Sequence, residues 1–286
     1  MKILIIVRAG KNSIHHTYMN QQMPDGIDFL ISRYDESPTI DFDTKFSKYQ
    51  QKDTGSKFGS IKRAYEDNKQ LFNKYDFVWI LDDDLYIPIS SLINVHNFSK
   101  KRICHLFQPA LDISSFASWP ITVQNKKFEF RVTDFVEIMA PVISMELFNI
   151  VVDKFDENFT GSGFEWYWQD VLAKNDEYAC ILDNAPIFHT RQIGGGEIYT
   201  NIGGRSNSFL LEDKFLQKYN LTRKITAFYG VSLINDQYYI TKSKSELMNG
   251  RDINSTIEPE TTENFIKSGF SCSENKEFLI KLLSRL

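Results

Sequence analysis

Two short segments that are apolar at almost every position constrain the fold of this chain most. They are residues 2–7 (KILIIV) and 75–81 (YDFVWIL). A strand with one wet face alternates apolar and polar residues, whereas a strand covered on both faces is apolar throughout. Both segments therefore predict buried strands of a parallel sheet. Residues 26–35 (GIDFLISRYD) predict another strand, which ends on the polar Tyr34 and Asp35.

The segments between and after these strands predict helices and further strands. Residues 57–75 place apolar side chains at helical spacing, with lysines on the opposite face. The order strand, loop, strand, helix, strand is typical of an α/β domain with a mostly parallel sheet flanked by helices. Further along, the pattern predicts strands within 102–112, 123–144 (broken at Pro141) and 178–190, and helices over 145–155 and 164–175.

The sequence becomes more polar from about residue 205. We therefore expect a main α/β domain over residues 1–204 and a C-terminal extension over 205–286, with membership of the same domain as the alternative. Within the extension, residues 229–242 predict a hairpin, 255–264 a loose segment and 277–286 a closing helix.

Charge and cysteine content exclude several classes of protein. The net charge of −4 gives no sign of a nucleic-acid-binding surface. Three widely spaced cysteines without a CxxC pair fit a reducing compartment. The N-terminal apolar run has only five residues before Arg8, which is short for a signal peptide, and no segment approaches the ~20 apolar residues of a membrane span. We expect a cytoplasmic protein.

Three consecutive carboxylates, Asp82, Asp83 and Asp84, directly follow the strand at 75–81. Ligands of such sheets bind at the carboxyl ends of the strands. Alternate side chains of an extended chain share a face, so we expect Asp82 and Asp84 on one side and Asp83 on the other. Mg²⁺ and Mn²⁺ are held by one or two carboxylates together with substrate phosphates. The triplet thus predicts a clamp for a metal-bound diphosphate, the alternative being a solvated acidic loop or a helix cap.

His189 stands at the end of the last apolar strand, just before a glycine-rich loop at 190–196 (TRQIGGG). A neutral imidazole could complete a metal shell begun by Asp84, although a packed or surface histidine is the alternative. In the loop, Arg191 could pair with phosphate, and the glycines would allow the backbone to approach a ligand closely.

The segment 161–170 (GSGFEWYWQD) places Glu165 and Asp170 near the start of a helix. A carboxylate there could act as general base on a hydroxyl, while Trp166 or Trp168 stacks on a sugar. The alternative is that acidic residues favour a first helical turn and that tryptophans fill the core. We favour Glu165 as the base because it lies nearer the glycines.

Taken together, KFGSIKRAYE, YDFVWILDDDL, QPALD, FVEIMAPVIS, GSGFEW and ILDNAPIFHT resemble, in this order, glycosyltransferases of the GT-A fold and in particular the DUF707 family. A weaker match covers IIVRAG and RYD, and nothing matches after about residue 205. The resemblance implies a GT-A-like (Rossmann-like) sheet, with Asp82 and Asp84 engaging the sugar and the metal and Asp84 as the favoured metal ligand. It also implies a metal-binding His189 and a base at Glu165, where the family more often has Asp.

We therefore expect a metal-dependent glycosyltransferase that uses Mn²⁺ or Mg²⁺ to move a hexose-like sugar from a nucleotide-sugar donor to a hydroxyl acceptor, with inversion. Bacterial surface polysaccharide synthesis is the expected setting, with peripheral attachment to the inner membrane through the acceptor or the last helix left open. The residues expected to contact substrate are Arg8, Asp35, Lys57, Asp82, Asp83, Gln108, Asp112, Trp166 and Arg191. For Lys57, as for Lys62, a solvated helix lysine is the alternative.

Two other functions remain open on the sequence. The first is an inactive GT-A-like protein that binds carbohydrate or nucleotide without turnover. The second is a sugar nucleotidyltransferase. Such enzymes usually carry a Gly-rich, basic phosphate loop after the first strand, whereas VRAGKNSIHH at 7–16 has a single glycine. We therefore rank the nucleotidyltransferase below the inactive binding protein.

Overall fold

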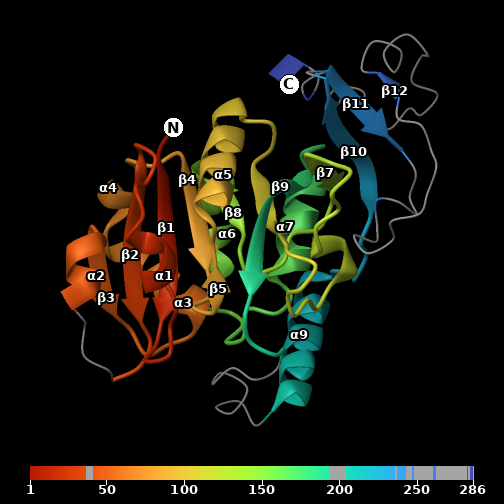
Figure 1. Ribbon diagram of the computed structural model, residues 1–286. Helices are drawn as coiled ribbons and strands as arrows, with labels where there is room; N and C mark the ends of the chain where they lie inside the picture. Colours follow the sequence, from red (N-terminus) through yellow and green to blue (C-terminus); the bar gives the residue numbers. More distant parts are fainter. Residues whose placement is uncertain are drawn as a thin grey trace.

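The computed structural model describes residues 1–36, 41–193, 204–235 and 237–242, together with Leu247, Glu260, Thr261, Leu282, Ser284 and Arg285. Figure 1 shows strands and helices that alternate along the chain. The strands are β1 (Ile3–Ala9), β2 (Ile27–Arg33), β3 (Tyr49–Lys52), β4 (Phe77–Leu81), β5 (Leu85–Tyr86), β6 (Leu106–Leu111), β7 (Phe130–Thr133), β8 (Val142–Ser144), β9 (Ala179–His189), β10 (Ala227–Ile234), β11 (Gln237–Thr241) and β12 (Glu260–Thr261). The α-helices are α1 (His16–Met19), α2 (Asp41–Phe46), α3 (Lys57–Asp67), α4 (Lys69–Phe72), α5 (Ile89–Lys101), α6 (Met145–Val151), α7 (Phe164–Ala173) and α9 (Arg205–Tyr219).

The described strands form one large sheet in the order β12-β11-β10-β7-β9-β6-β8-β4-β1-β2-β3, with β5 paired to β9 beside it. β1, β2, β3 and β4 run parallel to one another, as do β6 and β9. β8 runs antiparallel to both of its neighbours, β4 and β6. From β3 to β9, every described strand except β8 therefore runs the same way. The predicted α/β class with a mostly parallel sheet is confirmed, as expected of a GT-A-like fold.

Apolar side chains cover both faces of the sheet, as the apolar strands predicted. In β1, Ile3, Ile5 and Val7 lie in the hydrophobic cluster on one face, and Leu4 and Ile6 lie in the cluster on the other. All five are fully buried. The alternation follows from the two-residue period of a strand.

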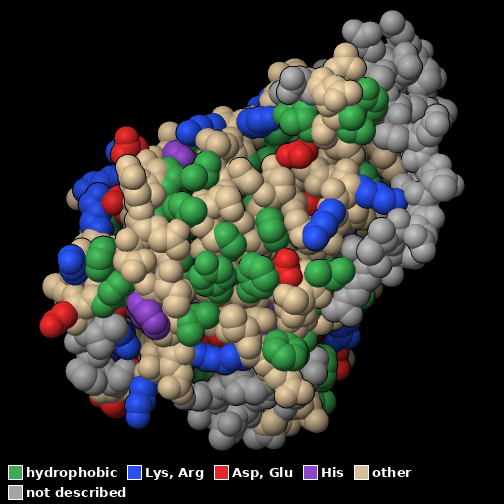
Figure 2. All heavy atoms as spheres, in the orientation of Figure 1, with side chains coloured by type: hydrophobic (Ala, Val, Ile, Leu, Met, Phe, Trp, Pro, Cys, Tyr) green, Lys and Arg blue, Asp and Glu red, His purple; other side chains and the backbone are tan. Residues whose placement is uncertain are grey.

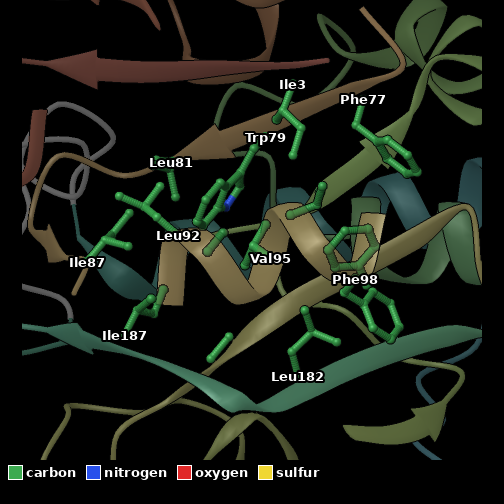
Figure 3. Close-up of a cluster of buried hydrophobic side chains, with 14 of the residues drawn as sticks. Ile3, Phe77, Trp79, Leu81, Ile87, Leu92, Val95, Phe98, Leu182 and Ile187 are labelled. Atoms are coloured by element: carbon green, nitrogen blue, oxygen red, sulfur yellow. The ribbon is translucent and has the colours of Figure 1, made fainter. Parts of the chain in front are cut away.

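Helices on the two faces complete these clusters. On the first face, α5 contributes Leu92, Val95 and Phe98, which lie among residues of β4 and β9 (Figure 3). On the second face, side chains of α3, α6 and α7 pack against the sheet and against one another. The predicted flanking of the sheet by helices is thus confirmed.

The structure corrects several predicted elements. The helix expected over 57–75 is divided at Asn68, whose φ of −137° is not helical, into α3 and α4. The helix expected over 145–155 ends at Val151 and continues as a 3₁₀ turn over Val152–Lys154. Four of the described helices, α1, α2, α5 and α9, were not predicted. The inward positions of α9 include the buried polar residues Ser208 and Glu212, which weakens the apolar stripe that sequence patterns detect.

The predicted hairpin is present as β10 and β11, and β10 extends the main sheet by pairing antiparallel with β7. The loose segment at 255–264 lies outside the described residues except for β12. The closing helix at 277–286 lies outside them except for Leu282, Ser284 and Arg285. The division of the chain at residue 205 stays a prediction.

Two features of the whole molecule concern its surface and its helices. On the face shown in Figure 2, basic and acidic side chains are interspersed, so that face offers no broad basic surface. Among the helices of the described residues, none combines the length and the apolar character needed to cross a bilayer.

Candidate active site

A cavity of about 350 Å³ lies at the carboxyl ends of β1, β4 and β9. In Figure 1, these ends face the lower part of the view, where α9 also lies. The charged residues that line the cavity are Arg8, Lys57, Asp82, Asp83, Asp84, Glu137, Glu165, His189, Arg191 and Glu212. The fold therefore brings together side chains that are up to about two hundred positions apart in the sequence.

The acidic triplet lies in a turn, and all three of its residues line the cavity. The same guanidinium nitrogen of Arg191 lies 3.1 Å from Oδ1 of Asp83 and 4.0 Å from Oδ2 of Asp84, so the expectation that these two side chains point to opposite sides is wrong. β4 ends at Leu81, so the alternation of an extended strand does not continue into the triplet. Two backbone hydrogen bonds fix the turn, from the amide of Asp82 to the carbonyl of Met139 (3.1 Å) and from the amide of Ile14 to the carbonyl of Asp83 (2.9 Å).

Asp84 and His189 face each other because β5 follows the triplet and pairs with the end of β9, with Leu85 opposite His189. Nε2 of His189 lies 3.3 Å from Oδ2 of Asp84. On the other side of the ring, Nδ1 of His189 lies 2.7 Å from the carbonyl oxygen of Phe116. Nδ1 therefore donates to this carbonyl and Nε2 is directed at Asp84. The second carboxylate oxygen of Asp84, Oδ1, is buried and has no hydrogen-bond partner among the described residues.

The pair is strongly coupled electrostatically. Burial alone would lower the pKa of His189, but the hydrogen bond and the charge of Asp84 outweigh it and raise this pKa to about 9. For Asp84, burial would raise the pKa, and the hydrogen bond and charge of His189 outweigh it and lower the pKa. Without a ligand, the pair is thus held as a carboxylate and an imidazolium.

Asp83 is bound by the protein's own donors. Its Oδ2 accepts hydrogen bonds from the Tyr34 hydroxyl (2.8 Å) and the Gly10 amide (3.2 Å). Its Oδ1 accepts one from Arg191 (3.1 Å). Arg191 also donates to the carbonyl of Asn12 (2.5 Å) and lines the cavity with a partly exposed side chain. Asp83 therefore fixes the guanidinium of Arg191 at the cavity wall.

Lys57 begins α3, and its ammonium group donates to Oδ1 of Asp82 (2.6 Å) and to the carbonyl of Ile138 (2.7 Å). Only 12% of its side chain is exposed, so the alternative of a solvated helix lysine is wrong for Lys57. Lys62, one turn further along, instead bonds to Asp156 and to the carbonyl of Asp153 and is not among the residues that line the cavity.

Glu165 occupies the first turn of α7 and lines the cavity. Its side chain is buried, and Oε2 accepts a hydrogen bond from the amide of Gly163 (2.8 Å). Burial raises the pKa of Glu165 to about 8. A carboxyl group whose pKa lies close to neutral pH is suited to proton transfer.

The aromatic side chain beside this carboxyl differs from the prediction. Trp166 is buried, donates from its indole nitrogen to Glu212 (2.9 Å), and is not among the residues that line the cavity. Trp119 lines the cavity instead, with its ring edge-on to that of Trp166 at 5.7 Å. Trp168 packs against Phe58 in the core, and Asp170 pairs with Lys174 at the helix surface.

Of the other residues predicted to contact substrate, Arg8 lines the cavity, and Asp35, Gln108 and Asp112 do not. Arg8 is buried, donates to the hydroxyl of Ser32 (2.7 Å), and has a pKa lowered by burial to about 10. The side chains of the remaining three accept hydrogen bonds from backbone amides. Asp35 accepts from Lys11 (2.6 Å), Gln108 from Glu137 (2.6 Å) and Asp112 from Ser114 (2.8 Å).

Several residues that line the cavity were not predicted, above all Glu137, Glu212 and Trp119. The sequence could have indicated Glu137 as a candidate site residue, because it is the one charged residue in the apolar stretch FVEIMAPVIS. Nothing in the sequence indicated Glu212, since α9 itself was not predicted. The expected glycine loop after Arg191 lies outside the described residues from residue 194 onward.

The side chains around Asp84 fit a divalent cation that binds together with a diphosphate. Within the described ranges, no three His, Cys, Asp or Glu side chains form a ready-made metal site. Asp84 and His189 supply two ligands, and Oδ1 of Asp84 is buried without a partner among those residues. Mg²⁺ is commonly held by one or two carboxylates, with water and substrate phosphates filling the other positions. A cation that binds together with a diphosphate is therefore compatible with this donor set.

Comparison with solved structures finds a similarity to TarS from S. aureus. The crystal structure of TarS 1–349 in complex with UDP-GlcNAc has a TM-score of 0.46 at 10% sequence identity, over 77% of this chain and 72% of that one. A second crystal structure of TarS 1–349 has a TM-score of 0.45 at 8% identity, over 85% of this chain and 97% of that one. No family model matches the sequence, and neither does any curated protein. The resemblance to the DUF707 family therefore stays a resemblance, and the chemistry rests on the site alone.

Proposed function

We propose that this protein is a metal-dependent glycosyltransferase that transfers a sugar from a nucleotide-sugar donor to a hydroxyl acceptor. The observation that carries the proposal is the pair of Asp84 and His189, which lines the same cavity as the buried carboxyl group of Glu165. Oδ1 of Asp84 has no hydrogen-bond partner among the described residues. Such an arrangement offers one group of residues for a leaving diphosphate and another for proton transfer.

The diphosphate would lie beside Asp84, His189 and Arg191. Mn²⁺ or Mg²⁺ held by Asp84 and His189, with Asp82 close by, would supply Lewis-acid stabilisation of the leaving group. Arg191, fixed by Asp83, presents donors that suit phosphate oxygens. Because Lys57 already neutralises Asp82, the side chain of Asp82 is held in place to accept a hydrogen bond from the donor.

The acceptor would lie beside Glu165, which takes the proton of its hydroxyl group. The raised pKa of Glu165 means that the carboxylate is generated near neutral pH and retains enough basicity for this step. A carboxylate that takes the proton of the acceptor hydroxyl is the base that a single displacement with inversion requires. Arg8, buried behind Tyr34 at the end of β1, lies where the nucleotide would bind.

The first experiment is a binding screen of UDP-, GDP-, CMP- and dTDP-sugars by thermal shift, with Mn²⁺ and separately with EDTA. A ligand at a hundred times its Kd stabilises the folded state by about 2.7 kcal/mol, which raises the melting temperature by roughly 5 °C or more. We expect such a rise from one nucleotide class and only in Mn²⁺. If no donor raises the melting temperature under either condition, the proposed function is wrong.

A second measurement separates a transferase from an inactive binding protein. With the donor identified, release of the nucleoside diphosphate is followed in the presence of Mn²⁺ and candidate glycan acceptors. A transferase releases the nucleotide, slowly to water and faster with the correct acceptor. Metal-dependent binding without any release would support the inactive GT-A-like protein instead.

A further inference from the structure

Glu137 lines the cavity but has no role in the proposed transfer reaction. It lies in the segment between β7 and β8, and its backbone amide is fixed by Oε1 of Gln108 (2.6 Å). Its side chain lines the cavity but is only 5% exposed. Its Oε2 has no hydrogen-bond partner among the described residues. Glu137 therefore brings a carboxyl group to the cavity lining, and one oxygen of that group is buried without a hydrogen-bond partner among the described residues.

An unpartnered buried carboxyl oxygen is costly, because the group has lost its hydration without gaining another hydrogen bond. Buried polar groups in proteins nearly always have a hydrogen-bond partner, and a ligand that supplies the missing donor is one way to satisfy this oxygen. In a site for sugars, the donor at hand is a hydroxyl group. The burial that raises the pKa of Glu137 to about 7 also leaves the carboxyl group able to accept or to donate a hydrogen bond near neutral pH.

The position of Glu137 between the two halves of the site indicates which ligand group it meets. The Lys57 ammonium joins Asp82 (2.6 Å) to the carbonyl of Ile138 (2.7 Å), the residue after Glu137, so Glu137 lies near the proposed diphosphate end. The carbonyl of Val136, the residue before Glu137, accepts a hydrogen bond from Trp168 (3.1 Å), which shares helix α7 with the proposed base. In a displacement, the transferred sugar must lie between the leaving diphosphate and the acceptor. Glu137 is thus placed beside the transferred sugar.

The charge of this part of the cavity restricts the sugar. Glu137, Glu165 and Glu212 all line it. Glu212 is paired with Arg223 (2.8 Å) and with the Trp166 indole, whereas Glu165 has the Gly163 amide. A sugar that carries its own carboxylate offers Glu137 no hydrogen-bond donor at that group. Its charge would also oppose the ionisation of Glu137 and Glu165, whose pKa values burial raises to about 7 and about 8, so it fits this part of the cavity less well than a neutral sugar does.

We propose, on the basis of the function proposed above, that Glu137 determines sugar specificity: its carboxyl group accepts a hydrogen bond from a hydroxyl group of the transferred sugar, so that the site prefers neutral sugars to uronates and sialates. The nucleotide and the diphosphate do not contact Glu137. The sugar-dependent part of the binding affinity therefore depends on Glu137, and the nucleotide-dependent part does not.

The test compares nucleoside diphosphates with the matching nucleotide sugars by calorimetry in Mn²⁺, for the parent protein, Glu137→Gln and Glu137→Asp. The probes are UDP, UDP-glucose and UDP-glucuronate, GDP and GDP-mannose, dTDP and dTDP-glucose, and CMP-sialate. We expect Glu137→Gln to weaken binding of the neutral nucleotide sugar by about tenfold, with less than about a twofold change for the nucleoside diphosphate. Glu137→Asp, which keeps the carboxyl group but shortens its reach, should fall between. Glu146→Gln, on the exposed side of α6, serves as the matched control.

Each outcome decides between the inference and the function on which it rests. If nucleotide sugars bind the parent protein and Glu137→Gln keeps the same ratio of sugar-nucleotide to nucleotide affinity, the inference is wrong and the proposed function stands. Preferred binding of UDP-glucuronate or CMP-sialate by the parent protein also overturns it. If no nucleotide sugar binds the parent protein, the proposed function has failed and the inference falls with it. Should Glu137→Gln fail to fold, as judged by its melting curve, the Glu137→Asp ratio decides.

Discussion

Nε2 of His189 and Oδ2 of Asp84 lie 3.3 Å apart because the two residues stand at the ends of paired strands that are about a hundred positions apart in the chain. The Thr190 amide donates to the Asp84 carbonyl (3.0 Å), which continues the pairing beyond β9. The distance between the two side chains is therefore set by backbone hydrogen bonds. A rigid pair of this kind is suited to hold a cation in one position.

Asp84→Asn tests the proposed metal site. The amide keeps the shape of the side chain but removes its charge, so the metal-dependent part of donor affinity should fall by at least about tenfold, as even outer-shell changes do at metal sites. Calorimetry with the donor, in Mn²⁺ and in EDTA, measures that part. Asp112→Asn is the control, because this carboxylate lies outside the cavity lining and bonds only locally to Ser114. Undiminished metal-dependent binding in Asp84→Asn would remove Asp84 from the metal site.

Lys57→Met should destabilise the fold more than Lys62→Met, although both lysines lie on α3. Lys57 is largely buried and bonds to Asp82 and Ile138. Breaking a fully buried pair costs about 3–5 kcal/mol, but Asp82 is 38% exposed, so we expect roughly 1–2 kcal/mol. Lys62 pairs with the half-exposed Asp156, and its loss should cost less than about 1 kcal/mol. Urea unfolding of the two variants measures the difference, and equal free energies of unfolding would contradict the structural role of Lys57.

Glu165→Gln should change how stability depends on pH. Burial raises the pKa of Glu165 from 4.5 to about 8 in the folded state, so the folded state binds this proton more tightly than the unfolded chain does. The stability from this group is complete below about pH 4.5 and is lost as the pH rises through 8. Glutamine cannot ionise. Relative to the parent protein, the variant should therefore gain at least about 2 kcal/mol in free energy of unfolding between pH 5 and pH 8.5.

Urea unfolding at several pH values measures this gain. The control is Glu146→Gln, in which the replaced side chain is 69% exposed, and it should follow the parent protein at each pH. A Glu165→Gln curve parallel to that of the parent protein would mean that Glu165 is not buried as an acid.

Gly163→Ala should cost more stability than Gly204→Ala. The two glycines share a φ above +100°, which strains any residue with a side chain by about 1–3 kcal/mol. At Gly163, a Cβ atom would also lie 3.0 Å from Cδ1 of Phe215, whereas no atom of the described residues lies within 4 Å of the Cβ position at Gly204. The two variants thus share the strain, and the contact with Phe215 separates them. Melting curves that give the same loss for both would show that Phe215 moves aside without cost.

The sequence by itself determined the elements whose signal is local. β1 and β4 were predicted because strands buried on both faces must be apolar at successive positions. The end of β4 at the acidic triplet followed from the change in polarity after Leu81, and the place of Glu165 in a first helical turn followed from the glycines before it. These features depend only on neighbouring residues.

Tertiary structure alone decided which side chains meet in the cavity. The turn after Leu81 directs all three aspartates into it, α3 brings Lys57 to Asp82, and the pairing of β5 with β9 brings His189 to Asp84. α9 escaped prediction because the side that it buries carries Ser208 and Glu212, which form hydrogen bonds with the distant Ser162 and Trp166. A local pattern records whether a residue is apolar, but a buried polar contact depends on where a partner far along the chain is placed by the packing of the whole sheet.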